Sequence, residues 1–194
     1  MKQIDNVKVF GLEDSVRAAK FPMLADAEKA TSEITDRTYS LFSVPTGTGH
    51  DNALKGIVVQ FDLTMTPKMS VELERYHFID FVSSQSTMHR ITKFNLDEAY
   101  IKYVDPRVIE IMKEKVRQYN ETDPSSDRAK QLYLEILYTN PCGIYLTARM
   151  TTNYQQLKTI YLQRRNHRLP EWQTFCDWVE TLPFFMDFCI KKKK

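Results

Sequence analysis

Two short segments with alternating apolar and polar residues constrain the fold of this chain more than any other feature. They are residues 57–65 and residues 144–151, and in each the apolar side chains fall on one side of an extended backbone. In the first segment these side chains are Val59, Phe61, Leu63 and Met65. Long stretches with helical spacing border both segments. Two strands separated by helices predict an α+β domain with a small sheet, and they exclude a doubly wound sheet.

Helical patterns account for most of the remaining chain. Residues 12–42 have helical periodicity, which Pro22 divides into two parts. The other expected helices cover residues 67–86, 106–119, the stretch after Asp127, residues 153–165 and residues 170–183. A sheet of two strands leaves apolar helix faces uncovered, and we therefore expect an oligomer.

Length and composition fit one domain. The chain has 194 residues, of which 42% are hydrophobic, and this is enough for one well-filled core. We expect a single domain over residues 1–190 followed by a basic tail over residues 191–194.

Charge argues against a dedicated nucleic-acid binder. The formal net charge is +2, yet the last four residues are all lysine, so the remaining chain is slightly acidic. Proteins that bind duplexes usually carry a basic stripe in the folded domain. Nucleic acid is therefore an unlikely partner, and the lysine tail is interpreted as a solubilising end.

Cysteine usage and hydropathy point to the cytoplasm. The three cysteines, Cys142, Cys176 and Cys189, are widely spaced in apolar contexts, so we expect buried thiols and no metal site. The N-terminal segment has no apolar core of the kind a signal peptide needs, and no stretch is long and apolar enough to span a membrane. These features predict a cytoplasmic protein with no membrane partner.

A polar stripe marks the expected helix over residues 153–165. Helical spacing places five residues on one line: Asn153, Leu157, Tyr161, Arg164 and Arg168. Guanidinium groups in such a stripe suit a phosphate or a pyrimidine carbonyl, because they offer paired donors. The alternative is a solvated helix end, where arginines offset the helix dipole. Periodicity alone leaves both interpretations open.

Two further segments carry polar groups without defining a chemistry. Residues 75–90 begin with aromatic residues and end with Ser83, Ser84, Gln85 and Ser86, which can bind a ligand or simply end a helix. A loop containing Gly49 and His50 precedes the first strand. Common enzyme motifs such as GxGxxG, GxxxxGK[ST] and GxSxG do not occur in the sequence.

In this order and at these separations, the three segments resemble the flavin-dependent thymidylate synthase family (ThyX). That family has a histidine loop before a strand, the motif RHRxxSxNxxSxR, and a later helix of the form TxNxRxLxxFLxxRxxxxAQxEIR. His50 matches the loop histidine, and the first motif falls on residues 76–88, where His77 and Ser86 match. In the late helix, Asn153, Leu157 and Arg164 match, and Arg168 falls where the family usually has a histidine.

Several motif positions differ from the family. Both arginines of the RHR triplet are replaced, by Tyr76 and Phe78, and the motif's last arginine by Met88. Arg90, two residues further on, is the candidate to replace that last arginine. Phe81 replaces the motif's first serine, and Ser83 replaces its asparagine. In the late helix, Gln155 replaces the arginine of TxNxR. Each lost charge-assisted contact would weaken flavin binding by about 1.5–3 kcal/mol unless new contacts compensate.

The resemblance implies a ThyX-like fold with a small antiparallel sheet flanked by long helices, and a homotetramer with sites shared between subunits. It also implies reductive methylation of dUMP or a related pyrimidine deoxynucleotide, with FAD as cofactor and with methylene-tetrahydrofolate and NADPH as co-substrates. Arg164 would be catalytic and polarise the uracil carbonyl. Gln85, Ser86, Arg90 and Arg168 would bind substrate. His50, His77 and Asn153 would face the flavin, and no metal is expected.

Three readings remain open from the sequence. The first is an active flavin-dependent enzyme. The second is a non-catalytic nucleotide-binding or regulatory protein that keeps the ThyX-like fold, a reading motivated by the replaced arginines. The third is a nucleic-acid binder that uses its lysine tail.

Overall fold

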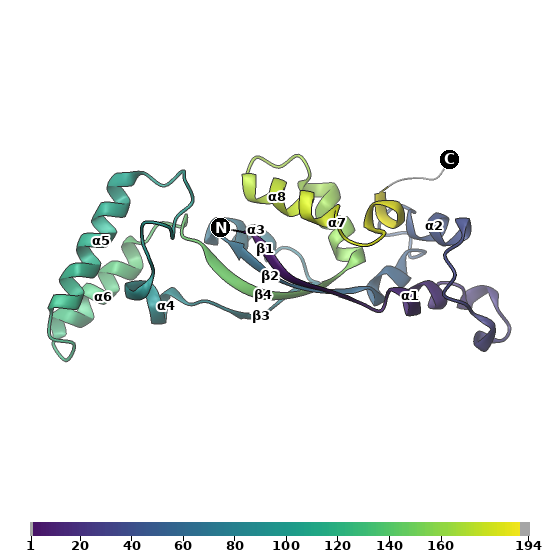
Figure 1. Cartoon of the computed structure of the whole chain (residues 1–194), viewed down its shortest axis with the longest axis horizontal. Helices are drawn as coiled ribbons and strands as arrows, with labels where there is room; N and C mark the ends of the chain where they lie inside the picture. The colour runs from purple at the N-terminus through teal and green to yellow at the C-terminus, as the bar shows by residue number, and fades with distance from the viewer. Residues whose placement is uncertain (1, 191–194) are drawn as a thin grey trace. The chain divides into compact units, whose positions relative to one another are not determined.

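The computed structural model describes residues 2–190 of the chain, so the lysine tail lies outside the described residues. Four strands form one sheet in the order β1-β2-β4-β3 (Figure 1). They are β1 (Ile4–Phe10), β2 (Val58–Met65), β3 (Ile79–Ser84) and β4 (Leu146–Asn153). The sheet is antiparallel and the architecture is α+β, which confirms the predicted fold class.

The chain divides into two compact units. The first unit comprises residues 2–63, 73–82 and 149–190, and the second comprises residues 64–72 and 83–148.

The helices of the first unit come from both ends of the chain. They are α1 (Leu12–Ala18), α2 (Asp36–Phe42), α7 (Tyr154–Arg164) and α8 (Pro170–Val179), with short helical turns η1 (Phe21–Met23), η2 (Ala27–Lys29), η3 (Asn52–Gly56) and η5 (Met186–Ile190). The predicted apolar face of β2 is buried, and its Phe61 ring lies 4.5 Å from Trp178 and 6.1 Å from Phe175 of α8 (ring centroids). Packing of α8 against β2 therefore forms the core of this unit.

The second unit is built on a pair of helices, α5 (Pro106–Glu121) and α6 (Asp127–Thr139), which lie side by side (Figure 1). Both begin as the sequence predicts: Pro106 opens α5 behind the cap Asp105, and the Ser126 hydroxyl accepts from the Ala129 amide at 3.1 Å. The core beneath them includes Met112, Ile136 and Tyr100. The rest of this unit contains α3 (Pro67–Leu73), α4 (Thr87–Arg90) and η4 (Ile91–Lys93).

The predicted helix over residues 67–86 is wrong beyond Leu73. Helix α3 ends at Leu73, and residues 79–84 form the edge strand β3. Hydrogen bonds to β4 hold this strand: the Thr152 hydroxyl donates to the Phe78 carbonyl at 2.6 Å, and the Gln85 amide donates to the Thr147 carbonyl at 2.9 Å. The aromatic and β-branched run suits a strand, and pairing with β4 overrides the local helical spacing.

The prediction of two strands is also incomplete at the N-terminus. Strand β1 pairs with β2 in a register that joins Ile4 to Leu63 and Phe10 to Val58, with an irregularity between Asp5 and Lys8. Most of its side chains are exposed, so its alternation in the sequence is weak.

Candidate functional site

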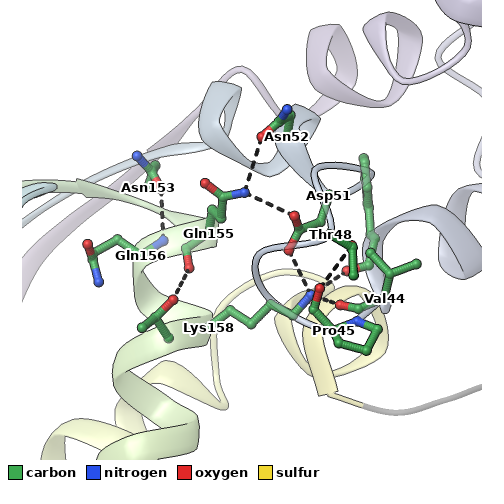
Figure 2. A network of polar contacts seen from close by, with 11 residues as sticks. Val44, Pro45, Thr48, Asp51, Asn52, Asn153, Gln155, Gln156 and Lys158 are labelled. Carbon is green, nitrogen blue, oxygen red and sulfur yellow. Dashed lines mark hydrogen bonds and ion pairs between the residues drawn. The ribbon is translucent and has the colours of Figure 1, made fainter.

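The start of α7 is tied to the preceding loop by a buried ion pair. The Lys158 ammonium lies 3.0 Å from the Asp51 carboxylate, and the two side chains are 2% and 0% exposed. The same ammonium donates to the Phe42 carbonyl at 2.9 Å and to the Val44 carbonyl at 2.6 Å. Figure 2 shows Lys158 reaching from α7 into the turn of the loop, where these acceptors converge. One side chain thus holds both ends of the loop over residues 44–51.

All three N–H groups of Lys158 have acceptors, which is the condition under which a buried ammonium is tolerated. The second carboxylate oxygen of Asp51 accepts from the Gln155 side-chain amide at 3.0 Å. Among residues 2–190, no buried side-chain nitrogen or oxygen lacks a partner. The network is therefore complete, and it fixes the loop against the first turn of α7.

Beside this network lies a pocket of about 320 Å³. Its lining includes Gly47, Gly49, Lys55, Phe78, Gln155 and Thr159. Both glycines have positive φ angles of 93° and 81°, and a Cβ added to either would meet nothing within 4 Å. Here the left-handed backbone requires glycine, whereas the space itself would accept a side chain.

The structure brings together the three segments in which flavin-binding residues are expected. Gly49, Phe78 and Gln155 line the pocket, and each lies within two residues of a predicted cofactor-binding residue, namely His50, His77 and Asn153. His50 and His77 are themselves exposed. The Asn153 side chain accepts from the Gln156 amide at 2.9 Å and caps α7, so its oxygen is committed to the helix.

Arg164 is held between two aromatic rings of the first unit. Its guanidinium carbon lies 5.7 Å from the Tyr76 ring centroid and 5.0 Å from that of Trp172. Its Nε donates to the Tyr76 hydroxyl at 2.8 Å, and that hydroxyl donates to Gln163 at 3.0 Å. Tyr76, which stands where the motif has its first arginine, therefore positions the predicted catalytic arginine. Arg168, beyond the end of α7, is exposed.

The other predicted substrate residues belong to the second unit. The Gln85 side chain accepts from the Thr147 amide at 2.8 Å, Ser86 precedes α4, and Arg90 ends α4. Arg90 lines a pocket of about 590 Å³ within this unit. Other residues of its lining are Met88, His89, Lys93, Asn120 and Tyr133. The pocket gathers two cations and a histidine, a set that suits an anionic ligand.

The segment that lines this second pocket also fits the family motif in a second register. When RHRxxSxNxxSxR is placed on residues 88–100, His89, Arg90 and Asn95 match the motif's histidine, second arginine and asparagine. The residues that the first register missed are thus His89 and Asn95. A comparison of both registers over the whole segment would have found them from the sequence.

Cysteine and metal chemistry contribute little to these sites. Burial raises the pKa of the Cys176 thiol to about 11 and also raises that of Cys189, so both are inert thiols at neutral pH. Cys142 is exposed, which corrects the expectation that all three are buried. Within the described part of the chain, no group of histidine, cysteine or acidic residues could hold a metal ion, and no helix is long and apolar enough to cross a membrane.

The fold defined by this sheet and its helices is that of the flavin-dependent thymidylate synthases. No sequence-family model matches the chain, and no curated protein matches it by sequence. The likeness is to solved structures.

One of these is the crystal structure of flavin-dependent thymidylate synthase ThyX from Helicobacter pylori complexed with FAD and dUMP. It has a TM-score of 0.71 and 14% identity, over 97% of this chain and 100% of that chain. A second structure of Helicobacter pylori ThyX with FAD and dUMP has a TM-score of 0.72 and 12% identity, over 98% of each chain. At such identities the likeness shows the fold, and the predicted ThyX-like fold is thereby confirmed.

Proposed function

We propose that this protein binds a pyrimidine deoxynucleotide, with dUMP as the first candidate, and methylates it in a flavin-dependent reaction. The observation that carries the proposal is the match over nearly the whole chain to two structures that hold FAD and dUMP. Two pockets with nucleotide-binding character support it, one in each unit.

The residues of the first pocket fit a flavin nucleotide. Lys55 offers a cation for a phosphate, Phe78 offers an aromatic face that is 59% exposed, and the Gln155 and Gln156 amides offer polar groups for a ring edge. In this assignment His50, His77 and Asn153 flank the flavin. When bound, reduced FAD supplies the hydride for the reductive methylation, with methylene-tetrahydrofolate as carbon donor and NADPH as reductant.

The residues around Arg164 would polarise the substrate. A guanidinium held by Tyr76 and Trp172 is preorganised to hydrogen-bond a uracil carbonyl and to stabilise negative charge that develops on it. Gln85, Ser86, Arg90 and Arg168 are the proposed substrate contacts. His89 and Lys93, which line the same pocket as Arg90, add donors for a phosphate.

Two measurements test this function. Purified protein should show flavin absorbance, or acquire it when FAD is added, and it should methylate dUMP in the presence of methylene-tetrahydrofolate and NADPH. Arg164→Ala should lower kcat at least about 10²-fold, the cost typical of removing one preorganised donor, and should leave the fold intact. Full turnover in this variant would show that α7 has been assigned to the wrong site.

A non-catalytic nucleotide-binding or regulatory protein is the second candidate, and one observation favours it. In the first register of the motif Tyr76 stands where the family has an arginine, as Gln155 does in the late helix, and both side chains are engaged within the protein. Such a protein would take up no flavin at high FAD, while dUMP would still raise its melting temperature.

We further propose that the protein is a homo-oligomer, with a tetramer as the first candidate. Large apolar side chains are exposed on the helices of the second unit, including Ile111, Leu134 and Tyr138. Light scattering coupled to size exclusion tests this proposal, and a monomer at micromolar concentration would refute it. Localisation in the cytoplasm remains a prediction from the sequence.

A further inference from the structure

The buried ion pair determines which atom of Gln155 faces the first pocket. Lys158 has only donors, so the atom of residue 51 that meets it must be an acceptor. An Asp51 carboxylate paired with an ammonium also has only acceptors, so its other oxygen can be reached only by a donor. The nitrogen of the Gln155 amide must therefore point to Asp51, as it does at 3.0 Å. The usual ambiguity of an amide orientation is thus removed by the chemistry of its neighbours.

The consequence is that the Gln155 oxygen is left for a ligand. Figure 2 shows the amide nitrogen directed to Asp51 and Asn52, with the oxygen on the opposite side. That oxygen accepts no hydrogen bond from any residue in the described chain, and Gln155 lines the pocket. The pocket therefore presents an acceptor of fixed orientation.

We propose that the Lys158–Asp51 pair makes Gln155 a specificity-determining residue, which selects a planar heterocycle with an N–H donor at its edge. The exposed Phe78 ring supplies a stacking face for such a heterocycle, and Lys55 supplies a cation for a phosphate attached to it. An imide N–H of uracil or of a flavin ring has this chemistry, and so does the amino group of adenine. The inference deepens the proposed function because it states how one pocket recognises its ligand.

Three probes distinguish the sources of this chemistry: dUMP, FMN and ADP. Each is titrated calorimetrically against its N-methylated counterpart, which lacks the donor, namely N3-methyl-dUMP, N3-methyl-FMN or N6,N6-dimethyl-ADP. At least one probe should bind about 5-fold more tightly than its methylated counterpart, as expected for one hydrogen bond. Failure of all three probes to bind would overturn the proposal.

Gln155→Met separates the hydrogen bond from steric effects. Methionine is similar in size to glutamine but has no comparable hydrogen-bond acceptor. A steric clash with the methyl group of the methylated probe would therefore persist in Gln155→Met, and only the hydrogen bond to the N–H of the unmethylated probe would be lost. The preference of Gln155→Met for the unmethylated probe should be about 5-fold smaller than that of the wild type, and any preference that remains measures the steric effect of the methyl group. Equal discrimination by Gln155→Met and the wild type would overturn the proposal.

Asp51→Asn tests the role of the ion pair. The asparagine oxygen must face Lys158, so its amide nitrogen faces residue 155 and forces the Gln155 amide to turn over. The pocket then presents a donor, and the probe should bind more weakly to Asp51→Asn than to Gln155→Met. Glu28→Gln, which removes one charge from an exposed side chain, is the matched control and should bind as the wild type does.

Outcomes for this inference and for the proposed function are separable. Binding of ADP with the expected Gln155 dependence, in a protein that takes up no FAD and does not methylate dUMP, would support the inference and refute the flavin-dependent function. If the protein methylates dUMP but Gln155→Met and Asp51→Asn both bind the probes as the wild type does, the function would be supported and the inference refuted. If Asp51→Asn fails to fold, the Gln155→Met comparison still decides the question.

Discussion

Replacing Lys158 should destabilise this protein more than any surface substitution. In Lys158→Met the new side chain is apolar and helix-compatible, but Asp51 is left as a buried carboxylate without its cation. The Phe42 and Val44 carbonyls also lose their donor. Breaking a buried ion pair by removing one partner costs about 3–5 kcal/mol, most of it from the unpaired charge that remains.

Urea unfolding of Lys158→Met and of a matched surface variant measures this cost. Lys130→Met removes an exposed ion pair with Asp127, whose side chains are 70% and 98% exposed, and it should change the free energy of unfolding by less than about 1 kcal/mol. A loss of 3–5 kcal/mol in a chain of this size lowers Tm by roughly 6–20 °C. If both variants lost the same stability, the ion pair would not hold the loop as described.

A double variant separates the charge from the packing. In Lys158→Met combined with Asp51→Leu, no unpaired charge remains, and an apolar pair in place of a buried ion pair is often neutral or stabilising. The double variant should therefore be more stable than Lys158→Met alone. If the double variant lost as much stability as the two single variants lose together, the carboxylate and the ammonium would not be coupled.

Three other perturbations have defined outcomes. Burial raises the pKa of Tyr100 to about 12, above its unfolded value near 10, so its contribution to stability is present below about pH 10 and is lost between about pH 10 and 12. The wild type should therefore lose about 2–3 kcal/mol of stability over this range in alkaline unfolding curves, and Tyr100→Phe should not. The exposed control Tyr138→Phe should behave as the wild type does. Asn153→Ala should lower the free energy of thermal unfolding by about 1 kcal/mol, since it removes the α7 cap, and Asn153→Asp should retain most of it. Tyr76→Phe removes the hydroxyl that accepts from Arg164, so dUMP turnover should fall while circular dichroism shows an intact fold; unchanged turnover would mean that Tyr76 does not position the arginine.

The sequence predicted the elements whose periodicity agrees with their environment. Strand β2 alternates because one of its faces is buried under α8, and the caps of α5 and α6 are local side-chain interactions that short segments specify completely. Strand β1 was not predicted because most of its side chains are exposed, and β3 was wrongly predicted as helix because the apolar residues of its segment also fit helical spacing. An edge strand owes its conformation to hydrogen bonds with its neighbour, which the sequence of the strand alone does not encode.

Periodicity and motifs predicted only part of the candidate site. Periodicity identified the Arg164 stripe, and the family motif pointed to the segments around the first pocket. Lys158 was not identified from the sequence as a buried residue, because lysine side chains are normally exposed to solvent. Its position gave a usable signal, since it lies four residues after Tyr154 and three before Tyr161, both buried on the same face of the helix. Its partner Asp51 lies 107 residues away, and no local pattern connects the two.

The position of the positive charge on α7 suggests what this pocket recognises. The family motif has an arginine where Gln155 stands, a residue suited to binding a phosphate or carboxylate directly. In this chain the cation lies three residues further along, at Lys158, where it is buried and bound to the loop. The charge is therefore paired with Asp51 and orients a neutral amide, and in the proposed recognition the ligand would meet a hydrogen-bond acceptor at this position. A site of this kind discriminates by the hydrogen-bonding pattern of a ring edge, and the methylated probes measure that property directly.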